Sequence, residues 1–231
     1  MKISISQPRY LPAFNYIQRI SISDAFVLFD NVQHNSKDYE NRNKVKTSNG
    51  PVWLSIPLQR NTSRMMISDL YFADSQWIEK HKKTIFLNYS KAPFFDLDML
   101  DWLYDFEKQN EYSFVAVCES MLKKHLQLLN VKTPIYKATE MNLFCKKDAL
   151  LAEITQYLKG DTYISGPNGR KYINKDNFNG INILFHEYNF PVYPQLWGTF
   201  VPWMSTLDII YNLGLDEAKN MLFNNYLLLE S

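Results

Sequence analysis

Three cationic side chains, Arg42, Lys44 and Lys46, occupy every second position of one short segment. In an extended strand this spacing places all three side chains on one face. A planar guanidinium beside two ammonium groups is suited to hold a phosphate or a carboxylate. The same alternation occurs on a charged edge strand that blocks pairing with another sheet, so spacing alone leaves both interpretations open. The flanking amides Asn41 and Asn43 favour a binding site.

Further polar side chains follow the expected strands at their carboxyl ends, where open α/β sheets bind ligands. Asp30 ends a buried apolar run and could bind a sugar hydroxyl or an amine, with Asn31 and Gln33 as bidentate hydrogen-bonding partners. An aspartate that only forms an Asx turn would explain the same position. Gln7 follows the first expected strand, and a turn from Gly166 to Arg170 follows a later one. These strand ends give the cations a place to converge.

His81 is the candidate general base. It shares one helix face with three other residues at i, i+4, i+7 and i+11 spacing: Trp77, Thr84 and Asn88. A histidine near its unperturbed pKa takes a proton from an amine or a hydroxyl at neutral pH. A partly buried structural histidine is the competing explanation. His186, inside an expected strand, is a weaker candidate for the same reason.

The two cysteines, Cys118 and Cys145, form no close pair. Cys118 lies on the apolar stripe of an expected helix, which is typical of a core residue. Cys145 precedes two lysines that could lower its thiol pKa, but the sequence places no histidine partner beside it. Short motifs for phosphate, dinucleotide or metalloprotease sites are absent, as is a spaced cluster of metal ligands. We therefore predict no metal and no bound cofactor.

The composition narrows the class of protein. The chain has 231 residues, 46% of them hydrophobic and 15% aromatic, which is enough to bury a sizeable core. A formal net charge of +1 argues against a duplex nucleic-acid partner, so any basic site must be local. The amino-terminal residues lack a signal-peptide core, and no apolar run reaches the roughly 18 residues of a membrane span. We expect a cytoplasmic protein with no transmembrane segment.

The elements that must position these residues follow an α/β order. Strand-like residues 2–6, helical residues 13–22 and an apolar strand at 25–29 form a βαβ unit. This unit predicts a mostly parallel sheet with a Rossmann-like core. A central helical insertion at about residues 75–130 is expected from helices over 75–89, 94–109 and 111–129. The other expected elements are strands at 52–58, 162–165 and 181–188, and helices at 147–158, at 205–213 and from 216 onward. We expect one domain over residues 1–231.

Several motifs, taken in chain order, resemble the WbqC-like protein family. They are Gln7-Pro8-Arg9-Tyr10-Leu11-Pro12, Asp30-Asn31-Val32-Gln33, Asn41-Arg42-Asn43-Lys44-Val45-Lys46-Thr47 with Trp53-Leu54, His81-Lys82-Lys83-Thr84-Ile85, Tyr89-Ser90-Lys91-Ala92-Pro93-Phe94-Phe95, Tyr163-Ile164-Ser165-Gly166-Pro167, Tyr193-Pro194-Gln195, and Ser205-Thr206-Leu207-Asp208-Ile209-Ile210-Tyr211-Asn212-Leu213-Gly214. The resemblance covers nearly the whole chain. The chain departs from the family pattern at Ser6, where a histidine usually precedes Gln-Pro, and at Asn15, where the family commonly has glycine.

The resemblance implies a bacterial protein of surface-polysaccharide (O-antigen, lipopolysaccharide) gene clusters and a glycyl or other acyl transferase. The leading hypothesis is therefore an N-acyl or aminoacyl transferase acting on a nucleotide-linked amino sugar, with acyl-CoA or an aminoacyl carrier as donor. A nucleotidylyl-transferase-like enzyme is one alternative, although its His-x-Gly-His turn does not occur here. A non-catalytic module that binds a sugar nucleotide or a partner protein is the other. The donor, the sugar and the oligomeric state stay open.

In the leading hypothesis the alternating cations hold the diphosphate, His81 removes a proton from the amine, and backbone N–H groups of the turn at Gly166 stabilise the oxyanion. Tyr10 and Trp53 would stack on the base or the sugar. The expected catalytic residues are His81 and Asp30. The expected substrate-binding residues are Gln7, Tyr10, Asn31, Gln33, Asn41, Arg42, Asn43, Lys44, Lys46, Trp53, Lys91, Gly166 and Arg170.

Overall fold

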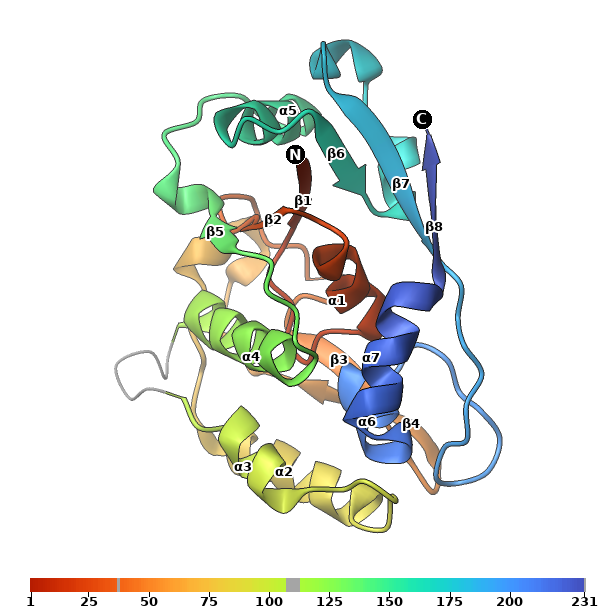
Figure 1. Cartoon of the computed structure of the whole chain (residues 1–231). Helices are drawn as coiled ribbons and strands as arrows, with labels where there is room; N and C mark the ends of the chain where they lie inside the picture. Colours follow the sequence, from red (N-terminus) through yellow and green to blue (C-terminus); the bar gives the residue numbers. More distant parts are fainter. Residues whose placement is uncertain (37, 107–112, 231) are drawn as a thin grey trace.

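A six-stranded sheet forms the centre of the computed structural model, which describes residues 1–36, 38–106 and 113–230 (Figure 1). The strand order is β5-β2-β1-β6-β7-β8. The strands are β1 (Lys2–Ser6), β2 (Ala25–Leu28), β5 (Ile135–Lys137), β6 (Thr162–Ser165), β7 (Asn182–Tyr188) and β8 (Tyr226–Glu230). Only the β7–β8 pairing is antiparallel among these strand pairs of the described chain. The predicted mostly parallel, Rossmann-like α/β fold is confirmed.

Alternation along β1 assigns the two faces of the sheet. Ile3 and Ile5 pack into the apolar cluster that contains helix α5 (Asp148–Tyr157). Ser4 and Ser6 point the other way, where Ser4 accepts a hydrogen bond from Ser23 and Ser6 accepts one from Arg19 of helix α1 (Phe14–Ser21). The sheet is therefore covered on both faces, as expected for parallel strands. Ser6, the last residue of β1, consequently faces α1.

Helices fill the part of the molecule below the sheet in Figure 1. Between the second hairpin strand and β5 lie α2 (Gln76–Tyr89), α3 (Leu97–Leu103) and α4 (Phe114–Leu128), and before β8 lie α6 (Thr206–Leu213) and α7 (Leu215–Asn224). Residues 107–109 and 111–112 of two expected helices fall outside the described residues. Helix α4 buries Cys118 in the large apolar cluster, in agreement with its expected core position. Strand β8 follows α7 where the sequence predicts only a final helix.

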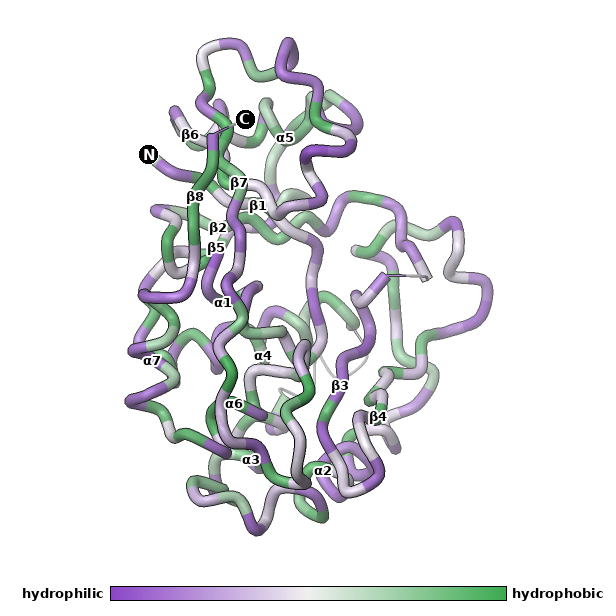
Figure 2. The backbone as a smooth tube through the Cα atoms, turned by 90° about the vertical axis from the view of Figure 1, so that its right-hand side faces the viewer, coloured by the Kyte–Doolittle hydropathy of each residue, from purple (hydrophilic) through white to green (hydrophobic). Residues whose placement is uncertain are grey.

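Strands β3 (Arg42–Thr47) and β4 (Gly50–Ser55) form a separate antiparallel hairpin. The chain turns at Gly50, whose φ of 97° is costly for a residue with a Cβ. The backbone N–H of Ser205 donates to the Lys44 carbonyl at 2.9 Å and holds the hairpin against the start of α6. Figure 2 shows β3 mostly in the hydrophilic colour beside the body of the molecule. The alternating cations therefore lie on a hairpin and not on the main sheet.

The order of the parallel strands reverses beside β1. From β1 the chain passes to β2 and β5 on one side, whereas β6 and β7 lie on the other side. At such a reversal the connections leave in opposite directions and open a crevice at the carboxyl ends of the strands. The described residues contain no helix long and apolar enough to cross a membrane.

Candidate functional site

A cavity of about 910 Å³ lies at this reversal, beyond the carboxyl ends of β1 and β6. This volume falls within the range of small-molecule sites. Its walls are formed by the segment after β1 together with α1, the residues after β2, the β3–β4 hairpin with the residues before it, the start of α5, the turn after β6 and the loop before α6. The polar and aromatic residues that line it are Ser6, Gln7, Arg9, Tyr10, Asn15, Tyr16, Arg19, Phe29, Asp38, Tyr39, Asn43, Lys44, Trp53, Lys147, Asp148, Tyr163, Asn168, Tyr172 and Trp203.

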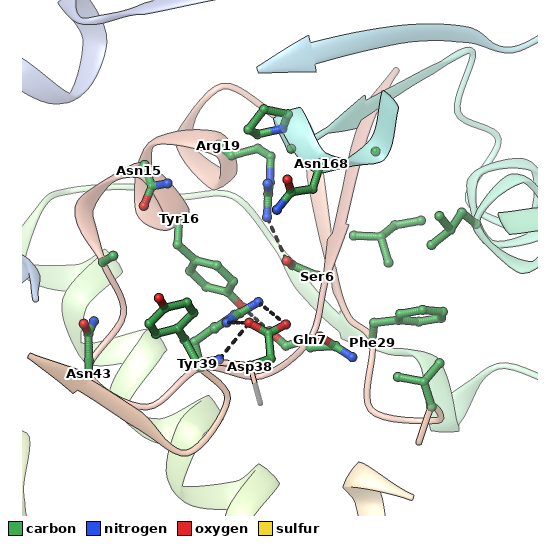
Figure 3. A pocket seen from close by; sticks show the side chains of 18 of the residues that line it. Ser6, Gln7, Asn15, Tyr16, Arg19, Phe29, Asp38, Tyr39, Asn43 and Asn168 are labelled. Carbon is green, nitrogen blue, oxygen red and sulfur yellow. Dashed lines mark hydrogen bonds and ion pairs between the residues drawn. The ribbon is translucent and has the colours of Figure 1, made fainter. Parts of the chain in front are cut away.

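Arg19 lies where these walls meet the sheet (Figure 3). Its side chain extends from α1 toward Ser6, and its Nη2 donates to Ser6 Oγ at 2.7 Å. The Arg19 Nε is buried and has no hydrogen-bond partner among the described residues. No carboxylate of those residues forms an ion pair with the guanidinium. Burial without such a partner lowers the pKa of Arg19, although a guanidinium stays charged at neutral pH.

Gly166 leaves room for this guanidinium. A Cβ at position 166 would lie 2.4 Å from Arg19 Nη1, closer than two such atoms can approach. The glycine has a φ of −75°, so close approach and not a special backbone conformation explains the residue. The turn after β6 can therefore pass directly over Arg19.

Arg9 contrasts with Arg19 because it has a carboxylate partner. Its two terminal nitrogens lie 3.0 and 3.3 Å from the two oxygens of Asp38. Burial opposes ionisation of Asp38, but the charge and hydrogen bonds of Arg9 outweigh it and hold the pKa of Asp38 below its usual value. Asp38 also accepts the backbone N–H of Tyr39 at 2.7 Å. The pair therefore fixes the wall that carries Tyr39.

Aromatic rings and cations form the part of the cavity wall beside the hairpin. Tyr39 and Trp53 are stacked, with ring centroids 5.4 Å apart and an interplanar angle of 28°. The Lys44 ammonium lies 4.7 Å from the centroid of the Trp53 ring, and the Arg42 guanidinium carbon lies 5.0 Å from it. Trp203 lines the cavity as well. A planar ligand group can stack on such a surface.

The charged side chains of the cavity are unbalanced. Its described lining contains four cationic side chains and two carboxylates: Arg9, Arg19, Lys44 and Lys147 against Asp38 and Asp148. The cavity thus has an excess of two positive charges, in a chain whose formal net charge is +1. A concave site with low-dielectric walls strengthens the field of such an excess, so the cavity favours an anionic ligand.

The structure separates the three alternating cations. Lys44 lines the cavity and Arg42 packs on Trp53. Lys46 is buried, and its ammonium donates to the carbonyl oxygens of Gly198 and Thr199 at 3.2 and 2.6 Å. Lys46 thus fastens the hairpin to a neighbouring loop and is unavailable to a ligand. A clamp made of all three cations does not form.

His81 also lies away from the cavity. It is buried, and its Nδ1 lies 2.6 Å from the hydroxyl of Tyr10, which in turn bonds the hydroxyl of Tyr104 at 2.6 Å. Burial, with a smaller effect of the Lys80 charge, lowers the pKa of His81 to about 4. His81 is not among the described cavity-lining residues. The geometry therefore gives it a structural place, and Tyr10 directs its hydroxyl into the same buried cluster.

Asp30 does not face the cavity either. Its two carboxylate oxygens accept the backbone N–H and the hydroxyl of Thr139, at 2.9 and 2.7 Å. Gln33 donates to the Ser63 carbonyl at 2.8 Å, and Asn31 is absent from the described cavity lining. Asp30, just after β2, therefore has a structural role: it anchors Thr139, which follows β5.

The remaining predicted residues divide into two groups. Gln7, Asn43, Lys44, Trp53 and Gly166 line the cavity, together with the buried Tyr10. Asn41, Lys91 and Arg170 do not. Asn41 donates to the Ile56 carbonyl at 2.9 Å, Lys91 is exposed on the surface, and Arg170 pairs with Glu187.

Arg19, the Arg9–Asp38 pair and Tyr39 have no counterpart among the residues expected from sequence. Arg19 is a single charge on an amphipathic helix, a pattern that usually indicates a solvated side chain. Arg9 stands within the Gln7 motif and was the one available signal. The described residues contain no group of three or more His, Cys, Asp or Glu side chains placed to hold a metal ion.

Comparison with known proteins identifies the family. The sequence profile of the WbqC-like protein family matches residues 7–220. Rv1507c of Mycobacterium tuberculosis, which is described as an uncharacterized protein, is 28% identical over 220 residues, or 93% of this chain and 95% of the relative. No solved structure matches. Because the profile runs from Gln7 at the cavity through the hairpin, the turn after β6 and most of α7, the chain belongs to the WbqC-like protein family.

Proposed function

We propose that this protein binds a nucleotide-linked amino sugar in the cavity at the reversal of strand order. It transfers an acyl or aminoacyl group to the amine of that sugar, in bacterial surface-polysaccharide synthesis. The observation that carries the proposal is the excess of two positive charges in a cavity whose wall also holds stacked aromatic rings. The pyrophosphate of a nucleotide sugar carries about two negative charges, and its base offers a planar face for stacking.

Each chemical part of such a ligand has a matching group in the wall. Arg19 and Lys44 suit the pyrophosphate, and the pair of Tyr39 and Trp53 suits the base. Side-chain amides suit sugar hydroxyls because each both donates and accepts; those in the lining are Gln7, Asn15, Asn43 and Asn168.

Asp148 suits the amine of the sugar. It lines the cavity, and no cationic side chain among the described residues pairs with it. The backbone N–H of Asn174 donates to one of its oxygens at 2.8 Å and holds its pKa below the usual value. An ionised carboxylate at this position attracts and orients an ammonium group.

In the transfer step, the ammonium first loses a proton to solvent water, and the neutral amine then attacks the carbonyl carbon of a thioester or ester donor. A C–N bond forms and the C–S or C–O bond breaks. The thiol or alcohol then leaves with the proton released by the nitrogen. Asp148 orients the nitrogen for this attack, and proximity supplies part of the rate enhancement.

The alternative of a non-catalytic sugar-nucleotide-binding protein is favoured by a separate observation. No histidine is found among the described residues that line the cavity, and the predicted base His81 is buried with a pKa of about 4. A cavity of this kind can hold a ligand without supplying a group that exchanges protons at neutral pH.

Two measurements test the proposal. Thermal unfolding is first compared with UDP-, dTDP- and GDP-linked amino sugars, and a nucleotide sugar at about 100 times its Kd should raise Tm by about 5 to 10 °C. Mass spectrometry then follows acylation of that sugar with acyl-CoA and aminoacyl donors.

The Asp148→Asn variant, with Asp216→Asn on the exposed start of α7 as its matched control, should lose turnover by about 10²-fold or more because the nitrogen is no longer oriented. Binding with no product from any donor supports the non-catalytic alternative. No response to any nucleotide sugar contradicts both.

A further inference from the structure

We infer that the Arg19 guanidinium binds a phosphoryl group, in a subsite formed with Ser6 beside it and the turn at Gly166 above it. This subsite is called the phosphate seat, or simply the seat. The inference deepens the proposed function and depends on it for the identity of the complete ligand. The seat itself accepts the chemistry shared by pyrophosphate and phosphate esters, which is a tetrahedral anion with several acceptor oxygens.

The first argument is the missing counter-charge. Arg9 of the same cavity has both oxygens of Asp38 as partners, whereas the one partner of Arg19 among the described residues is the neutral hydroxyl of Ser6. The nearby phenols of Tyr16 and Tyr163 do not compensate it, because burial raises the pKa of both well above neutral pH. A partly buried cation without an anion costs stability, and proteins keep such arrangements at functional sites.

The second argument is the supply of donors. A guanidinium carries five N–H groups, and the Arg19–Ser6 hydrogen bond uses one of them. The Nε has no partner among the described residues, and Nη1 lies under Gly166. The side chain of Asn168, which Figure 3 shows next to Arg19, lines the same part of the cavity. Because Nε is enclosed by the protein, a phosphate oxygen placed here meets the N–H groups of the two terminal nitrogens of the guanidinium.

The third argument is the place of the seat in the fold. Ser6 ends β1, and Gly166 follows β6, the strand beside it across the reversal of strand order. Phosphates of nucleotides bind at this point of other doubly wound sheets. A structural bridge between α1 and β1 would need only one donor for Ser6, which a neutral glutamine could supply. The charge is explained by a ligand and not by the bridge.

Isothermal titration calorimetry with inorganic pyrophosphate, and separately with a UDP-linked amino sugar, tests the seat. Arg19→Gln should bind both probes about 30- to 100-fold more weakly than the wild type, because a bidentate charged contact is lost. Arg19→Lys should bind them about 10-fold more weakly, since it keeps the charge and loses the fork. Gly166→Ala should also weaken binding, because its Cβ displaces Nη1. Arg170→Gln, whose guanidinium pairs with Glu187 outside the cavity, is the control and should bind as the wild type does.

Thermal unfolding of the unliganded variants distinguishes a phosphate-binding role of Arg19 from a purely structural role as a hydrogen-bonded bridge between α1 and β1. Arg19→Gln should unfold at the wild-type temperature or above it, since a partly buried charge without a counter-charge is removed. Wild-type affinity for pyrophosphate in Arg19→Gln overturns the seat. If that variant does not fold, wild-type affinity in Arg19→Lys overturns it.

Four outcomes keep the seat and the proposed function apart. Pyrophosphate binding that depends on Arg19, without binding of nucleotide sugars, keeps the seat and overturns the proposed function. Nucleotide-sugar binding that is unchanged in Arg19→Gln keeps the proposed function and overturns the seat. Arg19-dependent binding of both probes supports both, and failure of the wild type to bind either probe overturns both.

Discussion

Strand β3 connects two polar centres that contain similar groups and differ in one respect. Lys44 belongs to the cavity, and Lys46, two positions later, belongs to a buried centre around Asp208. Both centres combine cations with tyrosine hydroxyls and side-chain amides. In the Asp208 centre the carboxylate has hydrogen-bond partners within the protein. In the cavity, Arg9 is paired with Asp38, whereas the Arg19 guanidinium has no carboxylate partner among the described residues.

The contacts of Asp208 show how complete this centre is. Its carboxylate accepts from the hydroxyls of Tyr89 and Tyr193 and from the amide nitrogen of Gln195, each at 2.7 Å. Tyr89 also accepts the backbone N–H of Lys46 at 2.9 Å. A network satisfied in this way stabilises the fold. The comparison teaches that a charge without a counter-charge beside a cavity, and not the residue types alone, distinguishes a binding site from a structural centre.

Acidification should affect the buried interior most. Burial lowers the pKa of His81, His125 and His186 to about 4, against about 6.5 in the unfolded chain. The unfolded chain therefore binds more protons between these values, and stability present above pH 6.5 is lost as the pH falls toward 4. Each histidine should cost about 2 kcal/mol at pH 5 relative to pH 7. Urea unfolding at the two pH values measures the loss.

His125→Leu isolates one contribution to this loss. Its Nε2 has no partner among the described residues, so the variant should fold at pH 7 and show about one third less acid sensitivity. The raised pKa values of Glu40 and Asp208 act in the opposite sense and reduce the total. An unfolding free energy that is equal at pH 7 and pH 5 would contradict the prediction.

The second largest effect should come from opening the satisfied centre. Asp208→Ala leaves two hydroxyls and an amide without their acceptor and should lower the unfolding free energy by about 3 to 5 kcal/mol. Urea unfolding at pH 7 gives the value, and Asp216→Ala, an exposed aspartate at the start of α7, is the control with little expected change. A loss of unfolding free energy no larger than that of the control would show that the Asp208 centre does not stabilise the attachment of the β3–β4 hairpin to its neighbouring loop.

Removing the aromatic platform should act on binding and not on folding. Trp53 is 42% exposed, so Trp53→Ala should change stability little while it weakens binding of a nucleotide sugar by about 1 to 3 kcal/mol. Calorimetry with the nucleotide sugar and with its free sugar phosphate locates the effect. Equal weakening for both ligands would mean that the base does not stack on Trp53.

The smallest effects should come from the two lysines, in opposite measurements. Lys44→Met should weaken nucleotide-sugar binding by about 1 kcal/mol with little change in unfolding, because a partly exposed charge contributes modestly. Lys46→Met should leave the affinity unchanged and lower stability by about 1 to 2 kcal/mol, since two carbonyls lose their donor. If both variants changed the same quantity, the division between the two centres would be wrong.

Much of the fold follows from local sequence patterns. The first strand, the first helix and the strands at 162–165 and 181–188 lie within about two residues of their expected bounds, because hydrophobic periodicity defines each one locally. Strand β5 has three residues, and none of them is fully buried, so no periodic signal marks it. Among the described strands, β8 pairs with β7 alone, and no local pattern reveals this pairing.

The candidate site is only partly predictable. The rule that ligands bind at strand ends places Gln7 and Gly166 at the cavity. The same rule misleads at Asp30, because Thr139, which is distant in the sequence, donates hydrogen bonds to the Asp30 carboxylate. Arg19 becomes informative only once α1 lies over β1 and Gly166 has been brought above it. Such contacts depend on tertiary structure, which sequence spacing does not contain.

The strand order also has a consequence for how the protein is made. β1 leaves the ribosome first among the strands, yet one of its two neighbours, β6, is synthesised only after α5. Until then the edge of β1 that will carry the seat exposes unpaired backbone groups, and a growing chain with an open edge can pair wrongly or bind chaperones. Formation of the phosphate seat and pairing of the second edge of β1 therefore both wait until β6 has been synthesised.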